Sequence, residues 1–286
     1  MGAFSILNDI SALRSQNLLT QNSHNLSRTL LRLSSGKRIN SAADDAAGLW
    51  IADSLRANIR ALDQAARNAQ DGIGVAQIAD GALDQMTTIL TRAVTLAEEA
   101  ANGTIDSSGR ASLQAEFTQI QAEIARIATQ TNFNGVSIFT TNGINGALSI
   151  FVGDTSGASS ISVTIKSITT ANETVTDLGG ADLSGIDLST VTGAVSALTT
   201  LRDALRGVSG NRADIGAGMN RLQSAVTVIG NTSQNSASAE STIRDANVAE
   251  EVANLTKYQI LAQSGLSSLT QANTMHQIVL GLFRGM

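Results

Sequence analysis

Apolar residues recur in alternating steps of four and three positions near both ends of this chain, and the pattern is absent from its middle. The stepping covers four stretches, which are 55–101, 113–127, 198–229 and 248–283. Such a repeat gives a helix one narrow apolar seam that faces a partner helix and favours supercoiling. In the first stretch the only polar seam positions are Asp80 and Thr87. We therefore expect the two ends of the chain to pack side by side, with its middle at the far tip.

Length and composition favour thin helical packing over a thick globular core. A helix over 55–101 would measure about 70 Å, whereas a small domain is only about 30 Å across. Aromatic residues make up 3 % of the 286 residues, and proline, which would kink long helices, is absent. Gly72, Gly74 and Gly81 weaken this helix and indicate close backbone approach or a local irregularity. The predicted fold is mainly α, an elongated rod of long antiparallel coiled-coil helices from both termini with a small β-hairpin region in the middle of the chain.

The sequence also predicts where regular structure begins and ends. Helices are expected at 1–35, 55–101, 110–129, 191–235 and 245–284. Gly36 would end the first helix, because a left-handed residue is easiest for glycine. Asn40, Ser41 or Asp44 would cap a short helix that precedes residue 55. A polar patch at 231–238 would separate the last two helices.

The pattern changes period in the middle of the chain. Residues 161–166 alternate strictly between apolar and polar side chains, which is typical of a half-buried strand. Shorter runs of β type occur at 135–139 and 148–152, and the Asn-Gly pairs within 142–146 predict tight turns. Residues 169–190 are rich in Thr, Gly, Asp and Ser, so we expect them to form loop with little regular structure.

The charge of the chain argues against nucleic acid and membrane as partners. Its formal net charge is −5, whereas nucleic-acid binders usually carry a basic surface. Residues 258–283 lack formal charge, but their amide side chains would be costly in lipid, so we expect no membrane span. Residues 1–43 hold five Lys and Arg against Asp9 alone. This surplus is either a solvated helical face or a surface that meets acidic neighbours in an assembly.

No arrangement of residues predicts an enzyme, a cofactor or a metal site. The chain has no cysteine, and therefore no thiolate ligand or thiol nucleophile. His24 and His276 stand outside any cluster with metal-ligand spacing. Asp44, Asp45 and Asp53 suggest a cation site as one interpretation, but three acids near a turn more often cap helices or pair with arginine. We therefore expect no catalytic residue, no cofactor and no metal.

The terminal helices pose a physical problem, because each carries an apolar seam and few charges. A hairpin of two such helices would expose a long apolar stripe, and such stripes mark interfaces. We therefore predict that the ends self-assemble, with their ordering coupled to association. The predicted polymerisation interface is Ile6, Ile10, Leu13, Leu26, Leu30, Leu33, Val252, Leu255, Leu266, Leu269, Leu280 and Phe283.

Several stretches of this sequence resemble bacterial flagellins. Residues 32–48, RLSSGKRINSAADDAAG, closely resemble the N-terminal signature of that family, with Arg38, Asn40, Asp44 and Asp45 as the signature of a spoke connector. The match continues at 64–73, 130–135 and 259–265. The resemblance covers roughly 1–140 and 190–286, and leaves out the middle of the chain.

The resemblance implies a layered subunit. Its parts would be a terminal helical core layer of paired coiled coil (1–41 and 247–286), spoke connectors (42–56 and 235–246), a helical outer-tube domain (57–135 and 190–234) and a small variable β and loop segment on the outer surface (136–189). It implies a secreted, extracellular structural protein that self-polymerises into the bacterial flagellar filament for swimming. The implied partners are further copies of the chain, a flagellar export chaperone, and the cap and hook–filament junction proteins.

Two alternatives follow from the same resemblance. A hook–filament junction protein looks similar at both termini, and copy number separates it from a filament subunit. The alternative of another class is a ligand of an innate-immune Toll-like receptor. Flagellins that engage this receptor do so through a pattern that Arg92, Leu96 and Glu116 match here. Otherwise these three are ordinary surface and seam residues.

Overall fold

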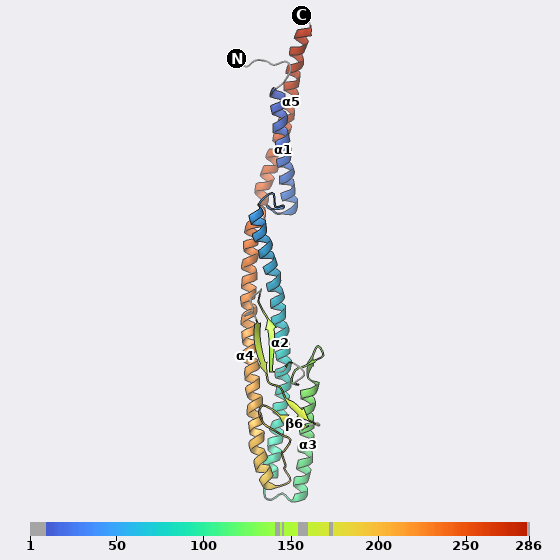
Figure 1. The fold of residues 1–286 in the computed structure, drawn as a ribbon, viewed down its shortest axis with the longest axis vertical. Helices are drawn as coiled ribbons and strands as arrows, with labels where there is room; N and C mark the ends of the chain where they lie inside the picture. The colour runs from blue at the N-terminus through green and yellow to red at the C-terminus, as the bar shows by residue number, and fades with distance from the viewer. Residues whose placement is uncertain (1–9, 141–143, 145, 154–159, 172–173, 285–286) are drawn as a thin grey trace. The chain divides into compact units, whose positions relative to one another are not determined.

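The structure is a computed structural model that describes residues 10–140, 144, 146–153, 160–171 and 174–284. The described residues form five helices, which are α1 (Ile10–Ser35), α2 (Ala46–Ala100), α3 (Ser107–Gln130), α4 (Val191–Arg244) and α5 (Val248–Arg284) (Figure 1). Between α3 and α4 lie the strands β1 (Asn132–Phe133), β2 (Val136–Ser137), β3 (Gly146–Phe151), β4 (Ser160–Ile165), β5 (Thr169–Ala171) and β6 (Thr174–Asp177). The prediction of a mainly α fold with a small β region in mid-chain is confirmed.

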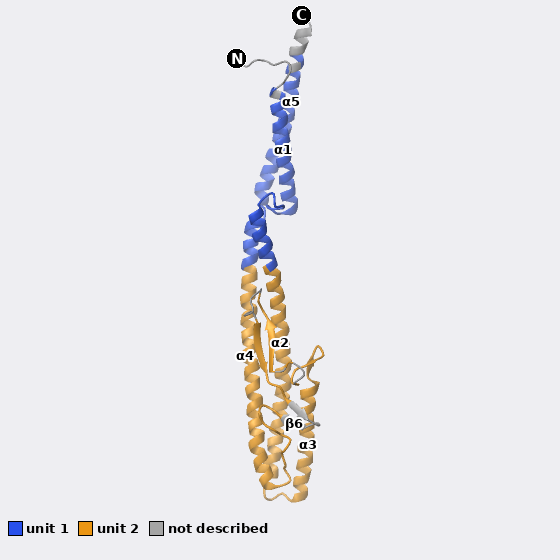
Figure 2. Ribbon diagram, in the orientation of Figure 1, with its two compact units in different colours: residues 1–57, 235–286 blue, residues 58–234 orange. Residues whose placement is uncertain are grey.

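The chain divides into two compact units (Figure 2). Unit 1 comprises residues 1–57 and 235–286, and unit 2 comprises residues 58–234. Helices α1 and α5 lie wholly in unit 1, whereas α3 and the strands lie wholly in unit 2. Helices α2 and α4 contribute residues to both. Unit 1 is therefore built from segments at opposite ends of the sequence.

Unit 1 pairs α1 with α5, and the two helices lie side by side (Figure 1). The Asn22 Nδ2 atom donates a hydrogen bond of 2.8 Å to the carbonyl oxygen of Tyr258. Farther along α1, Arg32 Nη1 lies 3.4 Å from Glu251 Oε1. The partner numbers fall along α5 as they rise along α1, so the pair is antiparallel.

Helix α2 begins at Ala46, and the prediction of a separate short helix before residue 55 is therefore wrong. The Oδ1 atom of Asp45 accepts the backbone N–H of Gly48 at 2.9 Å, which caps the long helix itself. A side-chain oxygen in this position satisfies one of the free amides of the first helical turn. Neither proline nor a further break separates Ala46 from residue 55, so the helix runs on.

Helix α4 runs through the polar patch at 231–238, where the sequence predicted a break between helices. Within this patch Thr232 Oγ1 donates to the carbonyl oxygen of Val228 at 2.9 Å, and Ser233 Oγ donates to Asp63 Oδ1 of α2 at 3.2 Å. The break comes later, after Arg244. Asn247 then caps α5, because its Oδ1 accepts the backbone N–H of Ala249 at 3.1 Å.

Unit 2 packs α2, α3 and α4 around a main apolar core, and Leu62, Ala65 and Ile229 form a second, smaller cluster. Buried members of the main core include Leu83, Met86, Leu90, Leu96, Phe117, Phe139, Leu183 and Leu201. Beside it, Arg212 Nε lies 2.8 Å from Asp80 Oδ1, and Arg212 Nη1 lies 2.8 Å from Asp84 Oδ1. Asp80 and Arg212 are charged members of the two facing seams, so their pairing selects one register of α2 against α4.

The strands of unit 2 form three separate antiparallel hairpins, β1–β2, β3–β4 and β5–β6. In the longest, Gly146 is paired with Ile165 and Phe151 with Ser160. The expectation of loop throughout 169–190 is wrong for β5 and β6, which pair with each other. Threonine and valine, which favour strands, supply most of these two strands.

Glycine lets the hairpin β3–β4 lie directly on the helices. A Cβ atom on Gly72 of α2 would stand 2.1 Å from Ile150 Cδ1, and one on Gly218 of α4 would meet β4 in the same way. A larger residue at either position would force the hairpin outward. The two other glycines predicted to mark close approach, Gly74 and Gly81, face open space.

Candidate assembly surface

The pair α1–α5 has no apolar core among its described side chains. Only Asn22, Thr29 and Glu251 are buried on these two helices, and all three are polar. Every described apolar side chain on them is half-buried or exposed, with exposed fractions that reach 66 % at Ile10 and 64 % at Met275. A helix pair normally buries its apolar seam. This one leaves it in contact with solvent.

The predicted interface residues divide by exposure. Four of them are half-buried, which are Leu26, Leu33, Leu255 and Leu269. Exposed are Ile10, Leu13, Leu30, Val252 and Leu266. Ile6 lies outside the described residues, as do the side chains of Leu280 and Phe283.

Sequence reasoning missed a further set of exposed apolar residues on the same helices. They are Leu18, Leu31, Ile260, Leu261, Met275 and Ile278. On α5 the heptad stepping selects only the seam that faces one partner helix, and Ile260, Leu261, Met275 and Ile278 lie off that seam. For the four of these residues that lie on α5, the signal in the sequence is the scarcity of charge along that helix rather than any period. The exposed apolar surface of the pair is therefore wider than a single seam.

The signature residues Arg38, Asn40, Asp44 and Asp45 all make hydrogen bonds inside unit 1. Arg38 Nη2 donates to the carbonyl oxygen of Ile243 at 2.7 Å, and Asn40 Nδ2 donates to Ser35 Oγ at 2.8 Å. Asp44 Oδ2 accepts the backbone N–H of Asn40 and of Ser41, at 3.3 and 3.1 Å. These bonds fix the turn between α1 and α2.

The cation interpretation of the acidic residues finds no support in this geometry. The carboxylate oxygens of Asp44 and Asp45 accept hydrogen bonds from backbone amides. Asp53 points elsewhere, with its Oδ1 atom 2.8 Å from Arg244 Nη1. Across the described residues there is no group of three or more His, Asp or Glu side chains that is arranged to hold a metal ion.

The carboxylate of Asp44 makes the turn sensitive to acid. Burial by itself raises the pKa of Asp44, but the amides of Ser41 and Asn40, the Ser41 hydroxyl and the charge of Arg32 lower it below its ordinary value of 3.8. A carboxyl group whose pKa is lower in the folded protein stabilises the fold at pH values above its ordinary pKa. This stability is lost as the pH falls through the pKa that the group has in the folded protein.

We therefore expect Asp44→Asn to weaken unit 1 slightly near neutral pH, and to behave like the native protein once the pH is well below 3.8. Hydrogen exchange of the amides of α1 and α5, followed in increasing urea at both pH values, measures this. A loss of stability in Asp44→Asn that is equal at both pH values would contradict the role of the charge.

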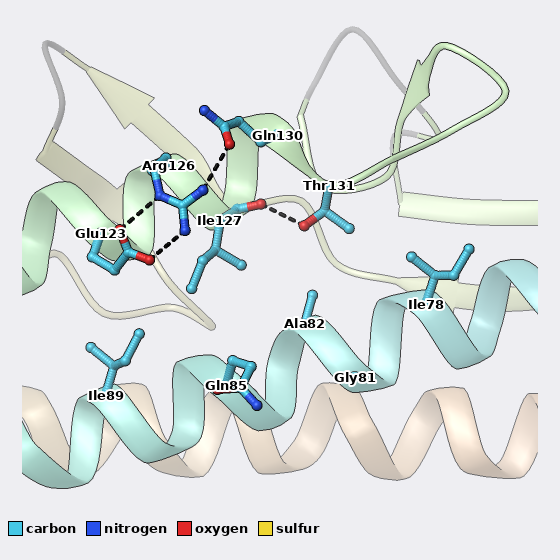
Figure 3. Close-up of a pocket in the computed structure, with 10 residues that line it drawn as sticks. All are labelled: Ile78, Gly81, Ala82, Gln85, Ile89, Glu123, Arg126, Ile127, Gln130 and Thr131. Carbon is cyan, nitrogen blue, oxygen red and sulfur yellow. Dashed lines mark hydrogen bonds and ion pairs between the residues drawn. The ribbon is translucent and has the colours of Figure 1, made fainter.

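A shallow groove lies between α2 and α3 in unit 2 (Figure 3). Its floor is apolar, formed by Ile78, Ala82, Ile89 and Ile127. At its rim Arg126 Nε lies 2.7 Å from Glu123 Oε2, and Arg126 Nη1 donates to Gln130 Oε1 at 2.7 Å. The hydrogen bond from Arg126 lowers the pKa of Glu123, so this carboxyl group stays ionised near neutral pH. The groove offers contact surface rather than acid–base chemistry.

The residues that match the receptor pattern are not all accessible. Arg92 Nη2 lies 2.7 Å from Glu116 Oε1, and both side chains are about half exposed. Leu96 is fully buried in the core of unit 2. The predicted contact is therefore corrected at Leu96, because a receptor cannot reach it without opening the helix packing.

None of the described helices contains a segment that is long and apolar enough to span a bilayer.

Comparison with known proteins matches both ends of the chain. The bacterial flagellin N-terminal helical region matches residues 6–143, and the bacterial flagellin C-terminal helical region matches residues 198–283. The chain is similar to the flagellar filament 30.7 kDa core protein of Treponema maltophilum, with 35 % identity over 97 % of this chain and 99 % of that protein. It is 39 % identical to a flagellin of Halalkalibacterium halodurans, over 90 % of this chain and 91 % of that protein.

Among solved structures, the chain is similar to the flagellin of Bacillus cereus, with 32 % identity and a TM-score of 0.47. The match covers 57 % of this chain and 88 % of the Bacillus cereus chain. The matches to the two helical regions and to near full-length relatives define the class of this protein. The chain belongs to the bacterial flagellin family.

Proposed function

We propose that this flagellin is the structural subunit of a bacterial flagellar filament, and that it polymerises through the apolar surfaces of α1 and α5. One observation carries the proposal. The described part of this helix pair buries only polar side chains, while nearly all its leucine, isoleucine and valine residues remain in contact with water. Surface of this extent marks an interface. Near full-length similarity to a filament core protein supports further copies of the chain as the occupant.

The physical basis of polymerisation is burial of this surface. Full burial of one leucine, isoleucine or valine side chain contributes about 1.5–3 kcal/mol. Several such side chains offset the cost of association and of ordering the helices. A contact between different surfaces of two copies does not close on itself, so it propagates into an open helical polymer.

The layers follow from the same proposal. Segments 1–41 and 247–286 form the inner core layer, 42–56 and 235–246 form the spokes, and 57–135 with 190–234 form the outer tube, with 136–189 on its outer surface. Arg38, Asn40, Asp44 and Asp45 hold the spoke turn. The assembled protein works outside the cell, where it transmits rotation for swimming.

The proposed partners besides the chain itself are an export chaperone, the filament cap and the hook–filament junction proteins. A free subunit exposes apolar residues along both terminal helices, and a chaperone that covers them before export would prevent premature association. The receptor alternative retains only the exposed pair Arg92 and Glu116, and the junction alternative has no observation of its own.

A charge placed on the exposed seam tests the proposal. We expect Leu266→Glu to raise the critical concentration for seeded polymerisation by about a hundredfold or more, because a buried unpaired carboxylate costs several kcal/mol. Leu266 is 54 % exposed in the free subunit, so folding should be unaffected. The matched control is Ser267→Glu, which adds the same charge at a neighbouring polar position and should change the critical concentration far less. Sedimentation and electron microscopy measure both. Equal polymerisation of Leu266→Glu and native protein would refute the proposed surface.

A further inference from the structure

We propose that Trp50, together with Ile51, packs against a neighbouring copy of the chain in the filament, as an interface outside the pair α1–α5. This inference rests on the proposed polymerisation. Trp50 is the only tryptophan of the chain, and 72 % of its surface is exposed. Ile51 beside it is 41 % exposed. Both lie near the start of α2, in unit 1.

The surroundings of Trp50 do not provide a partner within the subunit. Residues three and four positions away are its neighbours on the helix surface. Of these, Ala46, Ala47 and Ser54 are small and exposed, and Asp53 is engaged by Arg244. The indole N–H of Trp50 makes no hydrogen bond within the described part of the chain. The indole ring of Trp50 therefore projects beyond the small side chains around it on the helix, and it can enter a depression on another molecule.

The segment that carries Trp50 is firmly held. Ala52, on the opposite side of the helix, is completely buried, and Asp45 caps the helix start at Gly48. Two turns later, Arg56 Nη2 lies 2.6 Å from Glu240 Oε1 on α4. A rigid aromatic side chain on a fixed helix loses little entropy when it is covered.

The size of the patch indicates which molecule covers it. A tryptophan buries about 150–250 Å², whereas a specific protein interface needs about 1,200–2,000 Å² in total. Trp50 and Ile51 are thus too small a patch to recruit an unrelated protein by themselves. A second copy that is already bound through α1 and α5 of the same unit covers them without a second cost of association.

Tryptophan fluorescence tests this directly, because Trp50 is the one tryptophan in this sequence. We expect emission to shift to shorter wavelength, and quenching by acrylamide to fall several-fold, when monomers are seeded into filaments. Monomers mixed with phosphatidylcholine–phosphatidylglycerol vesicles provide the comparison for a lipid occupant, and should show neither change. A shift with vesicles but not in filaments would overturn the inference in favour of lipid.

Variants provide the second measurement. Trp50→Ala should raise the critical concentration at least about tenfold, as expected for truncation of an interface aromatic. Trp50→Phe should raise it less, and Ser54→Ala, on the same helix face, should leave it unchanged. Circular dichroism of the monomers checks that all three fold. Filaments whose tryptophan emission and quenching equal those of monomers would overturn the Trp50 contact and leave the proposed function intact. Failure of the native protein to polymerise would overturn both.

Discussion

Deletion of residues 248–286 is expected to yield a soluble monomer that forms no filaments at any accessible concentration. The deletion removes α5 and with it the exposed apolar residues of that helix, which are proposed to drive assembly together with those of α1. It also removes the partners of α1, since Asn22 loses the Tyr258 carbonyl oxygen and Arg32 loses Glu251. Most of the stability of a helix in a protein comes from tertiary packing rather than from its own propensity, and the truncated chain lacks the helix on which α1 packs. Helix α1 should therefore unfold as well.

Hydrogen exchange and electron microscopy measure the two consequences. Amides of α1 should lose their protection, while those of unit 2, residues 58–234, should keep it, because the core of that unit does not involve α5. This retained protection is the internal control that the truncated chain is folded. Filaments grown from the truncated protein would refute the role assigned to α5.

Phe117→Ala is expected to lower the free energy of unfolding of unit 2 by about 3–5 kcal/mol. Phe117 projects from α3 into the core and is only 1 % exposed. Its removal deletes the contacts of a whole ring and leaves a cavity that a packed helix bundle cannot fill by small movements.

The matched control is Phe133→Ala, which removes the same ring from a site that is 39 % exposed. We expect it to cost about 1 kcal/mol or less, because surface substitutions create no closed cavity. Urea unfolding followed by circular dichroism gives both values. Equal destabilisation by the two substitutions would show that the core of unit 2 does not depend on Phe117 as the packing implies.

The helices of this protein could be predicted from the sequence, whereas several of their ends could not. Asn40, Ser41, Asp44 and Asp45 are all acceptable caps within six positions, and only tertiary contacts decide among them. Asp45 caps α2, while Asp44 is used by the preceding turn.

The polar patch at 231–238, near the end of α4, shows that tertiary contacts also decide where a helix continues. Its Ser, Thr and Asn residues have weak helix propensity, and the sequence alone therefore predicts a break. In the structure Ser233 Oγ donates to Asp63 Oδ1 at 3.2 Å, so contact with α2 supports the helix there. Tertiary packing overrides local propensity.

The strands β5 and β6 were missed because turn-rich composition conceals short pairings.

The candidate surface could be predicted in kind but not in extent. The heptad pattern identified half-buried seam residues of α5, for example Leu255. It gave no account of Leu18 or Ile260, each 63 % exposed, because periodicity describes one partner and a polymer provides several. The pairing of Asp80 with Arg212 was likewise present in the pattern as two interruptions, but a single sequence does not say which interruptions meet.

The polar interior of the α1–α5 pair affects how the subunit behaves before it assembles. The buried Arg32 Nε and Glu251 Oε2 atoms have no hydrogen-bond partner in the described structure, so closing this hairpin brings little net gain. A hairpin with leucine in place of Arg32 and Glu251 would bury an apolar interior without any partner molecule, and its two helices would separate slowly. We therefore expect the two terminal helices to separate more easily before assembly than a hairpin with an apolar interior would.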